Sequence, residues 1–170
     1  MKKYGISRKI DELGRIVLPK EIRKNMRIRE NDELLIDVLD DKIILSKAYG
    51  IESSKVLNDV VYVMHQEFDI DILISNRDSI IASSNSKYLH KNINESIISE
   101  ILNNSSLTSS CVSNICLFED IMNIAYLIKP INCHGDIVGS LLCLSNNPLT
   151  DNLICAASII TKFLEKYLEE

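Results

Sequence analysis

The stretch that most constrains this chain is DELGRIVLPKEIR, at positions 11–23. Gly14 can adopt the positive φ that a tight reversal needs. The apolar, β-branched run at 15–18 favours a strand, which Pro19 would end because proline suits the first position of a helix better than a strand interior. An i, i+4 apolar pair then predicts a short helix over 20–27.

The flanking residues predict a small domain that is mostly sheet. We expect strands at 4–10, 33–38 and 42–45, with Asp40-Asp41 forming the last turn. The side chains expected to form the core around the turn and helix are Leu13, Ile16, Leu18, Ile22 and Met26. Four short strands and one short helix bury too little apolar surface to be stable alone. The sequence therefore predicts that this domain is a dimer.

Charge is distributed unevenly along the chain. Residues 1–29 carry ten lysines or arginines and three acids, a net charge of +7, whereas the whole chain carries −5. One interpretation is a solvated basic face, and the other is a surface that binds phosphate groups.

The pattern D-x-L-G-R-h-x-h-P-x-E-h-R at 11–23, where h is apolar, resembles the DNA-binding domain of the AbrB family of bacterial transition-state regulators. The resemblance implies a swapped-hairpin dimer, in which two chains interleave their strands into one barrel-like core. It also implies double-stranded DNA as a partner. The residues to which it assigns DNA contacts are Arg8 and Arg15 on the paired strands, Arg23 and Lys24 on the helix, and Lys9. Lysine and arginine supply this kind of affinity because they neutralise phosphates.

A change in charge suggests where the first domain ends. Residues 1–47 carry a net +3 and residues 48–170 a net −8, so the second part is not expected to contact nucleic acid. We predict an N-terminal domain over 1–48, a linker over 49–54 and a C-terminal domain over 55–170.

The C-terminal part predicts the order helix, two strands, helix, three strands, helix. The expected ranges are a helix from 55, strands at 71–75 and 79–83, a helix over 94–103, strands at 111–118, 123–130 and 137–144, and a helix to about 168. Pro130 is expected to end the second of the last three strands. This order is similar to that of a GAF domain, a small α/β sensor module. The predicted fold class is therefore α+β, an AbrB-like dimerisation domain followed by a GAF-like domain.

An AbrB-like domain joined to a GAF-like domain at this length is similar to a regulator of bacterial sporulation. We expect a transcriptional regulator that grips DNA with its N-terminal dimer. Its C-terminal domains would pair through the helices at 56–64 and 153–168 to give a homotetramer. One alternative is an antitoxin that binds a toxin partner. Another is a regulator gated by a small-molecule effector, in a GAF-like pocket that is otherwise filled by its own Ile and Leu.

Enzyme motifs are not apparent in the sequence. It has no nucleophile elbow or P-loop, and its three histidines are predicted to lie at the surface, so we expect no catalytic residue, cofactor or metal. The five cysteines form no Cys-x-x-Cys pair, and the three beside Leu, Ile or Ala are predicted to be buried. Without an 18-residue apolar run or a signal peptide, the expected location is the cytoplasm, away from membranes.

Overall fold

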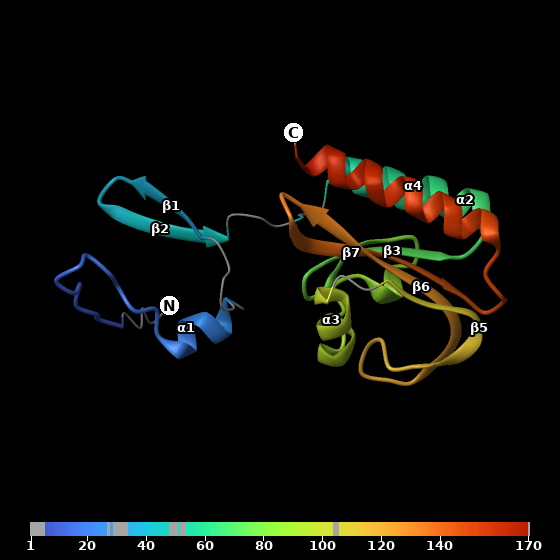
Figure 1. The fold of residues 1–170 in the computed structure, drawn as a ribbon, viewed down its shortest axis with the longest axis horizontal. Helices are drawn as coiled ribbons and strands as arrows, with labels where there is room; N and C mark the ends of the chain where they lie inside the picture. The colour runs from blue at the N-terminus through green and yellow to red at the C-terminus, as the bar shows by residue number, and fades with distance from the viewer. Residues whose placement is uncertain are drawn as a thin grey trace. The chain divides into compact units, whose positions relative to one another are not determined.

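The computed structural model describes residues 6–26, 28, 34–47, 51, 54–103 and 106–169. The chain divides into two compact units, Met1–Ala48 and Tyr49–Glu170 (Figure 1).

The N-terminal unit contains one short helix and one hairpin. Helix α1 spans Lys20–Asn25 and begins after Pro19, as expected from the geometry of proline. Strands β1 (Leu34–Leu39) and β2 (Lys42–Lys47) pair antiparallel. Their turn includes Asp40 with a φ of 52°, a conformation that aspartate tolerates well.

The predicted strands on either side of Gly14 are not formed in the single chain. Gly14 adopts a φ of 76° and the chain reverses there, as expected. The backbone N–H of Asp11 donates to the carbonyl of Arg15 at 3.0 Å, but residues 6–10 and 15–18 form no strand ladder. An isolated two-stranded hairpin is only marginally stable in water, so these runs need further strands to pair with. Residues 4 and 5 of the predicted first strand lie outside the described residues.

The expected core of this unit is also not enclosed by one chain. Leu13 is 74% exposed, and Ile16 and Met26 are exposed as well. Leu18 and Ile22 are only half-buried. A core formed by these residues in a dimer stays a prediction, because one helix and one hairpin provide no second layer to cover them in a single chain.

The C-terminal unit is built on a five-stranded antiparallel sheet with the order β4-β3-β7-β6-β5. Its strands are β3 (Asp71–Asn76), β4 (Ile80–Ser83), β5 (Leu107–Ile115), β6 (Met122–Cys133) and β7 (Asp136–Ser145). The predicted order of helices and strands is confirmed, with a short 3₁₀ helix at Ser86–Tyr88 in addition.

Helices cover both faces of this sheet (Figure 1). Helices α2 (Lys55–Phe68) and α4 (Asp151–Leu168) lie on one face, and α3 (Glu95–Leu102) lies on the other. Side chains at their N-termini accept hydrogen bonds from backbone N–H groups that the helix leaves unpaired. The capping residues are Ser54, Asn94 and Thr150.

Two hydrophobic clusters result, one on each face. Alternate residues of β3 divide between them, because successive side chains of a strand point to opposite faces. Ile72 and Ile74 pack with the α2 and α4 side, and Leu73 with the α3 side. Strand β7 divides in the same way, which explains its continuous apolar run.

Pro130 lies within β6 and does not end it, so that prediction was wrong. It pairs with Ser140 of β7, and β6 continues to Cys133. The last residue of β6 that pairs with β5 is Ile128, so within the described residues Pro130 has no partner on the β5 side of β6. A missing N–H is tolerated at such an edge.

Candidate nucleic-acid interface

The turn around Gly14 is organised by one carboxylate. Oδ1 of Asp11 accepts hydrogen bonds from the backbone N–H groups of Leu13, at 3.0 Å, and Arg15, at 2.8 Å. Its Oδ2 accepts a third from Nε of the Arg15 side chain, at 2.8 Å. Aspartate favours such turns because its short side chain reaches its own backbone.

These contacts also affect the charge state of Asp11. The backbone hydrogen bond from Arg15, and after it the side-chain one, lower the pKa of the Asp11 carboxyl. Because this pKa is lowered, the contact between Asp11 and Arg15 is fully formed at any pH above the ordinary pKa of aspartate. It is lost only as the pH falls through the lowered pKa of Asp11. Asp11 is therefore ionised, and paired with Arg15, throughout the near-neutral range.

Helix α1 presents the other predicted contacts. Arg23 and Lys24 lie in its last turn, where cations interact favourably with the negative end of the helix dipole, and Glu21 lies in its first turn. The N–H of Arg23 donates to the carbonyl of Pro19 at 3.0 Å, which fixes the start of the helix. Both basic side chains are exposed.

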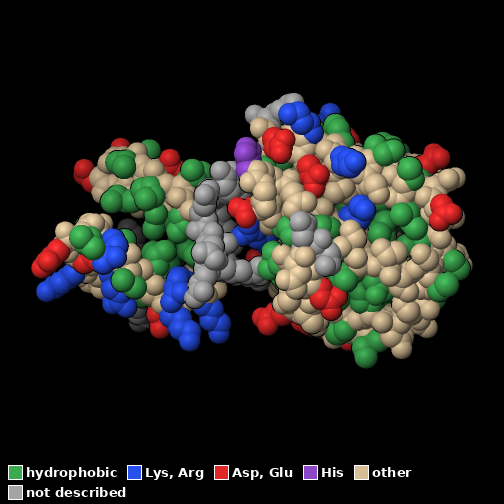
Figure 2. Space-filling model, in the orientation of Figure 1, with side chains coloured by type: hydrophobic (Ala, Val, Ile, Leu, Met, Phe, Trp, Pro, Cys, Tyr) green, Lys and Arg blue, Asp and Glu red, His purple; other side chains and the backbone are tan. Residues whose placement is uncertain are grey.

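All five residues predicted to contact DNA are exposed in the structure: Arg8, Lys9, Arg15, Arg23 and Lys24. Figure 2 shows Lys and Arg side chains gathered over the N-terminal unit, with hydrophobic side chains among them. Nη1 of Arg8 donates to the carbonyl of Ser7 at 3.2 Å, and Arg15 pairs with Asp11. The side chains of the other three make no hydrogen bond or ion pair among the residues that the structure describes, so their charges are available to a polyanion.

Exposed apolar side chains are a feature of this unit that charge counting missed. Ile10, Leu13, Ile16, Val17, Ile36, Val38 and Ile43 are each more than half exposed. Large apolar surfaces of this kind mark interaction sites. The alternation in β1 signals one apolar face, but only the fold shows that these side chains remain exposed in the single chain.

The C-terminal unit leaves little room beneath α3. The cavity lined by Ile93, Ile98 and Ile101 has a volume of about 10 Å³, roughly enough for one water molecule. This small cavity therefore offers no room for an effector directly beneath α3.

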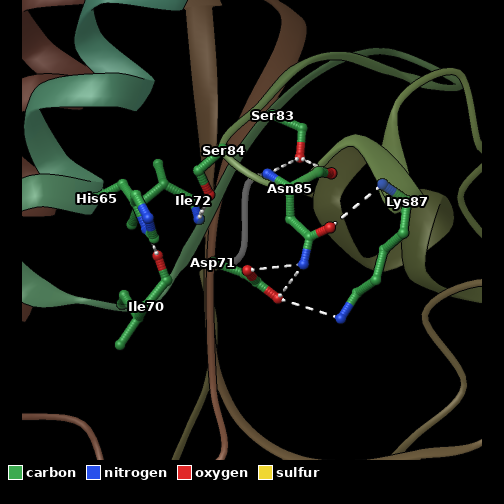
Figure 3. A network of polar contacts seen from close by, with 8 residues as sticks. All are labelled: His65, Ile70, Asp71, Ile72, Ser83, Ser84, Asn85 and Lys87. Carbon is green, nitrogen blue, oxygen red and sulfur yellow. Dashed lines mark hydrogen bonds and ion pairs between the residues drawn. The ribbon is translucent and has the colours of Figure 1, made fainter.

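An open cleft of about 510 Å³ lies elsewhere in this unit, where α2 ends and β3 begins. Figure 3 shows the polar network beside it. Asp71 accepts a hydrogen bond from Nδ2 of Asn85 at 3.2 Å and pairs with Nζ of Lys87 at 3.5 Å. Nδ1 of His65 lies 2.8 Å from the carbonyl of Ile70. Asp71 and Lys87 thus neutralise each other at the wall of the cleft.

Within the described ranges, no three His, Cys, Asp or Glu side chains cluster as metal ligands would. None of the helices in those ranges has the length and apolar character needed to cross a membrane.

Comparisons with known proteins agree with the division into two units. Residues 7–51 match the family described as antidote-toxin recognition MazE, bacterial antitoxin. Residues 52–169 match the family described as stage V sporulation protein T C-terminal, transcription factor.

Two relatives from Bacillus subtilis (strain 168) are similar in sequence. Stage V sporulation protein T is 37% identical over 155 residues, which cover 86% of each chain. Transition state regulatory protein AbrB is 57% identical over 47 residues, which cover 28% of this chain and 49% of AbrB.

Two solved structures share the fold of the C-terminal unit. A type II free methionine-R-sulfoxide reductase from Thermoplasma acidophilum aligns with a TM-score of 0.52 at 7% identity, covering 68% of this chain and 92% of that one. A GAF domain/HD domain protein from Geobacter sulfurreducens aligns with a TM-score of 0.51 at 12% identity, covering 69% and 93%. At these identities the likeness concerns the fold alone. The two units are therefore an AbrB-type domain and a GAF-like α/β domain.

The match over residues 52–169, together with the relative that is similar over most of both chains, shows that this protein belongs to the family of stage V sporulation protein T, a family of transcription factors.

Proposed function

We propose that this protein is a DNA-binding transcriptional regulator of sporulation genes, and that Arg8, Lys9, Arg15, Arg23 and Lys24 contact the DNA. The observation that carries the proposal is the exposure of all five side chains in a segment of net charge +7, within a chain of net charge −5. Neutralising phosphates releases condensed counterions, which is the main source of affinity for DNA. The similarity of residues 52–169 to a family of transcription factors supports the same function.

The DNA-binding unit of this proposal is a homodimer. The exposed apolar side chains of β1 and of the turn around Gly14 need a partner surface, and the same surface on a second copy of the chain would supply one. Interleaved hairpins would also provide residues 6–10 and 15–18 with the pairing that they lack in one chain. Each DNA-binding surface would then combine arginines from two copies.

The C-terminal domains would join two such dimers into a homotetramer. Helices α2 and α4 carry a helix-pair face, which we define as the exposed apolar residues Tyr62, Val63, Ile159, Phe163 and Tyr167. The rings of Phe163 and Tyr167 stack with their centroids 6.3 Å apart. Pairing of this face with its own copy would bury it.

Arg15→Ala and Arg23→Ala test the DNA-binding surface. Each variant should weaken binding to a promoter fragment by at least about fivefold and reduce the dependence of log K on log salt by about one. Titrations of the full chain at several salt concentrations measure both quantities. Lys162→Ala is the matched control, because it removes the same kind of charge from the exposed side of α4.

The surface is wrongly assigned if both arginine variants bind as the wild type does at every salt concentration while remaining folded by circular dichroism. Loss of binding in Lys162→Ala to the same extent would also contradict it, because the effect would then come from net charge alone.

Two other functions have an observation in their favour. The match of residues 7–51 to an antitoxin family favours a toxin partner, but the C-terminal unit here is an ordered domain with two buried clusters rather than a disordered tail. The cleft of about 510 Å³ favours gating by a small effector. Gating by an effector would be favoured if a metabolite stabilised the full chain against heat and a substitution at Asp71 abolished that stabilisation.

A further inference from the structure

The Arg15 guanidinium is held at one nitrogen only. Nε donates to Oδ2 of Asp11 at 2.8 Å, while the Arg15 side chain remains 71% exposed. Among the residues that the structure describes, the terminal nitrogens Nη1 and Nη2 have no hydrogen-bond partner. An arginine fork that grips two acceptor atoms on DNA uses two of its five N–H directions, and these can both come from the terminal nitrogens.

The anchor for this guanidinium is itself fixed. Oδ1 of Asp11 is bound to the backbone at Leu13 and Arg15, and the positive φ of Gly14 sets the turn between them. A long side chain normally loses much rotamer freedom when it binds. Because a fixed carboxylate already holds Nε, part of that loss has occurred before Arg15 meets DNA.

We infer that Asp11 is a positioning residue for DNA recognition, whose carboxylate holds Arg15 by Nε so that its two terminal nitrogens form a ready fork for a pair of acceptor atoms on DNA. The inference rests on the proposed function. The acceptors are either a guanine edge or phosphate oxygens, and Asp11 itself touches neither.

Positioning of Arg15 by Asp11 and simple charge repulsion predict opposite effects on DNA affinity when the charge of Asp11 is removed. Removing an acid from a surface that approaches phosphates should strengthen DNA binding, because one repulsion is lost. If Asp11 positions Arg15, removing its charge should weaken binding instead. Glu12 provides the matched control, because it is the neighbouring exposed acid and has no hydrogen bond or ion pair within the described ranges.

The test compares Asp11→Asn with Glu12→Gln in the full chain. Asparagine can still accept the two backbone hydrogen bonds, so the turn should survive and the variant should fold. We expect Asp11→Asn to weaken binding by about two- to fivefold, the size of an exposed ion pair, and Glu12→Gln to leave it unchanged or tighten it. The probes are a duplex selected by the wild type from random sequence and a scrambled duplex of the same length. A loss confined to the selected duplex indicates a guanine edge, and an equal loss on both indicates phosphate oxygens.

The double variant Asp11→Asn/Arg15→Ala separates positioning from a structural role. Without Arg15 nothing remains to position, so the double variant should bind no more weakly than Arg15→Ala alone. An equal loss from Asp11→Asn in both backgrounds would overturn the inference, because the turn itself would then be at fault. Tighter binding by Asp11→Asn, as for Glu12→Gln, would overturn it as well. If Arg15→Ala alone binds as the wild type does, the inference is overturned because Arg15 is not a DNA contact, and if Arg23→Ala does so too, the proposed DNA-binding surface has failed.

Discussion

At the scale of single residues, the cysteines of the C-terminal domain differ in how far they are buried. Cys133 and Cys143 are buried, whereas Cys111 and Cys155 are exposed. The prediction of burial beside apolar neighbours was right for Cys143 and wrong for Cys155, and Cys116 is only half-buried. Neighbours in sequence point in different directions on a helix, so Ile154 and Ala156 say little about the position between them.

Burial should protect Cys143 from alkylation. Loss of hydration raises the pKa of this thiol to about 12, with a smaller opposing effect from the charge of Lys129. A thiol with a raised pKa stays protonated until the pH approaches that value, so the reactive thiolate is scarce at pH 8. Iodoacetamide at pH 8 should therefore modify Cys111 and Cys155 of the folded chain and leave Cys143 intact, as read by peptide mass spectrometry. Modification of Cys143 at the rate of Cys155 would show that β7 opens readily.

At the scale of secondary-structure elements, the buried strands β3 and β7 pair their polar side chains with each other. Ser75 and Ser140 face each other across the two strands and are almost fully buried. Their Oγ atoms are 2.7 Å apart, and Oγ of Ser75 also lies 3.5 Å from the carbonyl of Ser140. Gly139 stands beside this pair, and a Cβ there would collide with the carbonyl of Ser75. The two strands approach closely because these side chains are small.

Ser75→Ala should lower the free energy of unfolding of the C-terminal domain by about 1–3 kcal/mol, because it leaves the buried hydroxyl of Ser140 without its partner. Ser140→Ala should cost less, since Ser75 keeps the nearby carbonyl. The double variant should cost less than the two single losses together, because no buried hydroxyl then remains unpaired. Urea denaturation followed by circular dichroism measures all three. Strictly additive losses would show that the two hydroxyls do not interact.

At the scale of the whole molecule, each unit leaves apolar surface uncovered. In the N-terminal unit it lies on β1 and around Gly14, and in the C-terminal unit it is the helix-pair face on α2 and α4. Self-association through the first surface would stabilise a domain of about 48 residues, and self-association through the second would join the dimers into the homotetramer that we propose.

Phe163→Ser tests the helix-pair face. Phe163 is 48% exposed, so its loss should leave the domain folded but remove apolar contact twice from a symmetric interface. Assembly into the larger species should weaken by about tenfold to a hundredfold. Analytical ultracentrifugation over a range of concentrations measures this. Ile121→Ser, which removes a side chain exposed outside this face, is the control. Equal mass distributions for Phe163→Ser and the wild type would exclude this face as the contact.

Much of the local structure could be predicted because its causes are local. The reversal at Gly14, the helix after Pro19, the caps Asn94 and Thr150 and the order of elements in the C-terminal domain each depend on a few neighbouring residues. The resemblance alone predicted the five basic residues as DNA contacts, and all of them are exposed, although their contact with DNA stays a prediction.

Only the tertiary structure decided which extended runs become strands, because a strand requires a partner that the sequence does not name. Residues 6–10 and 15–18 have none in one chain, whereas β6 continues past Pro130 because β7 still pairs with it. Packing also buries Thr161 in α4, where its hydroxyl donates to the carbonyl of Ala157. The hydrogen bond between Asp11 and Arg15 depends on both the sequence and the fold. The sequence places the two residues four positions apart, but only the folded turn brings the carboxylate of Asp11 to Nε of Arg15.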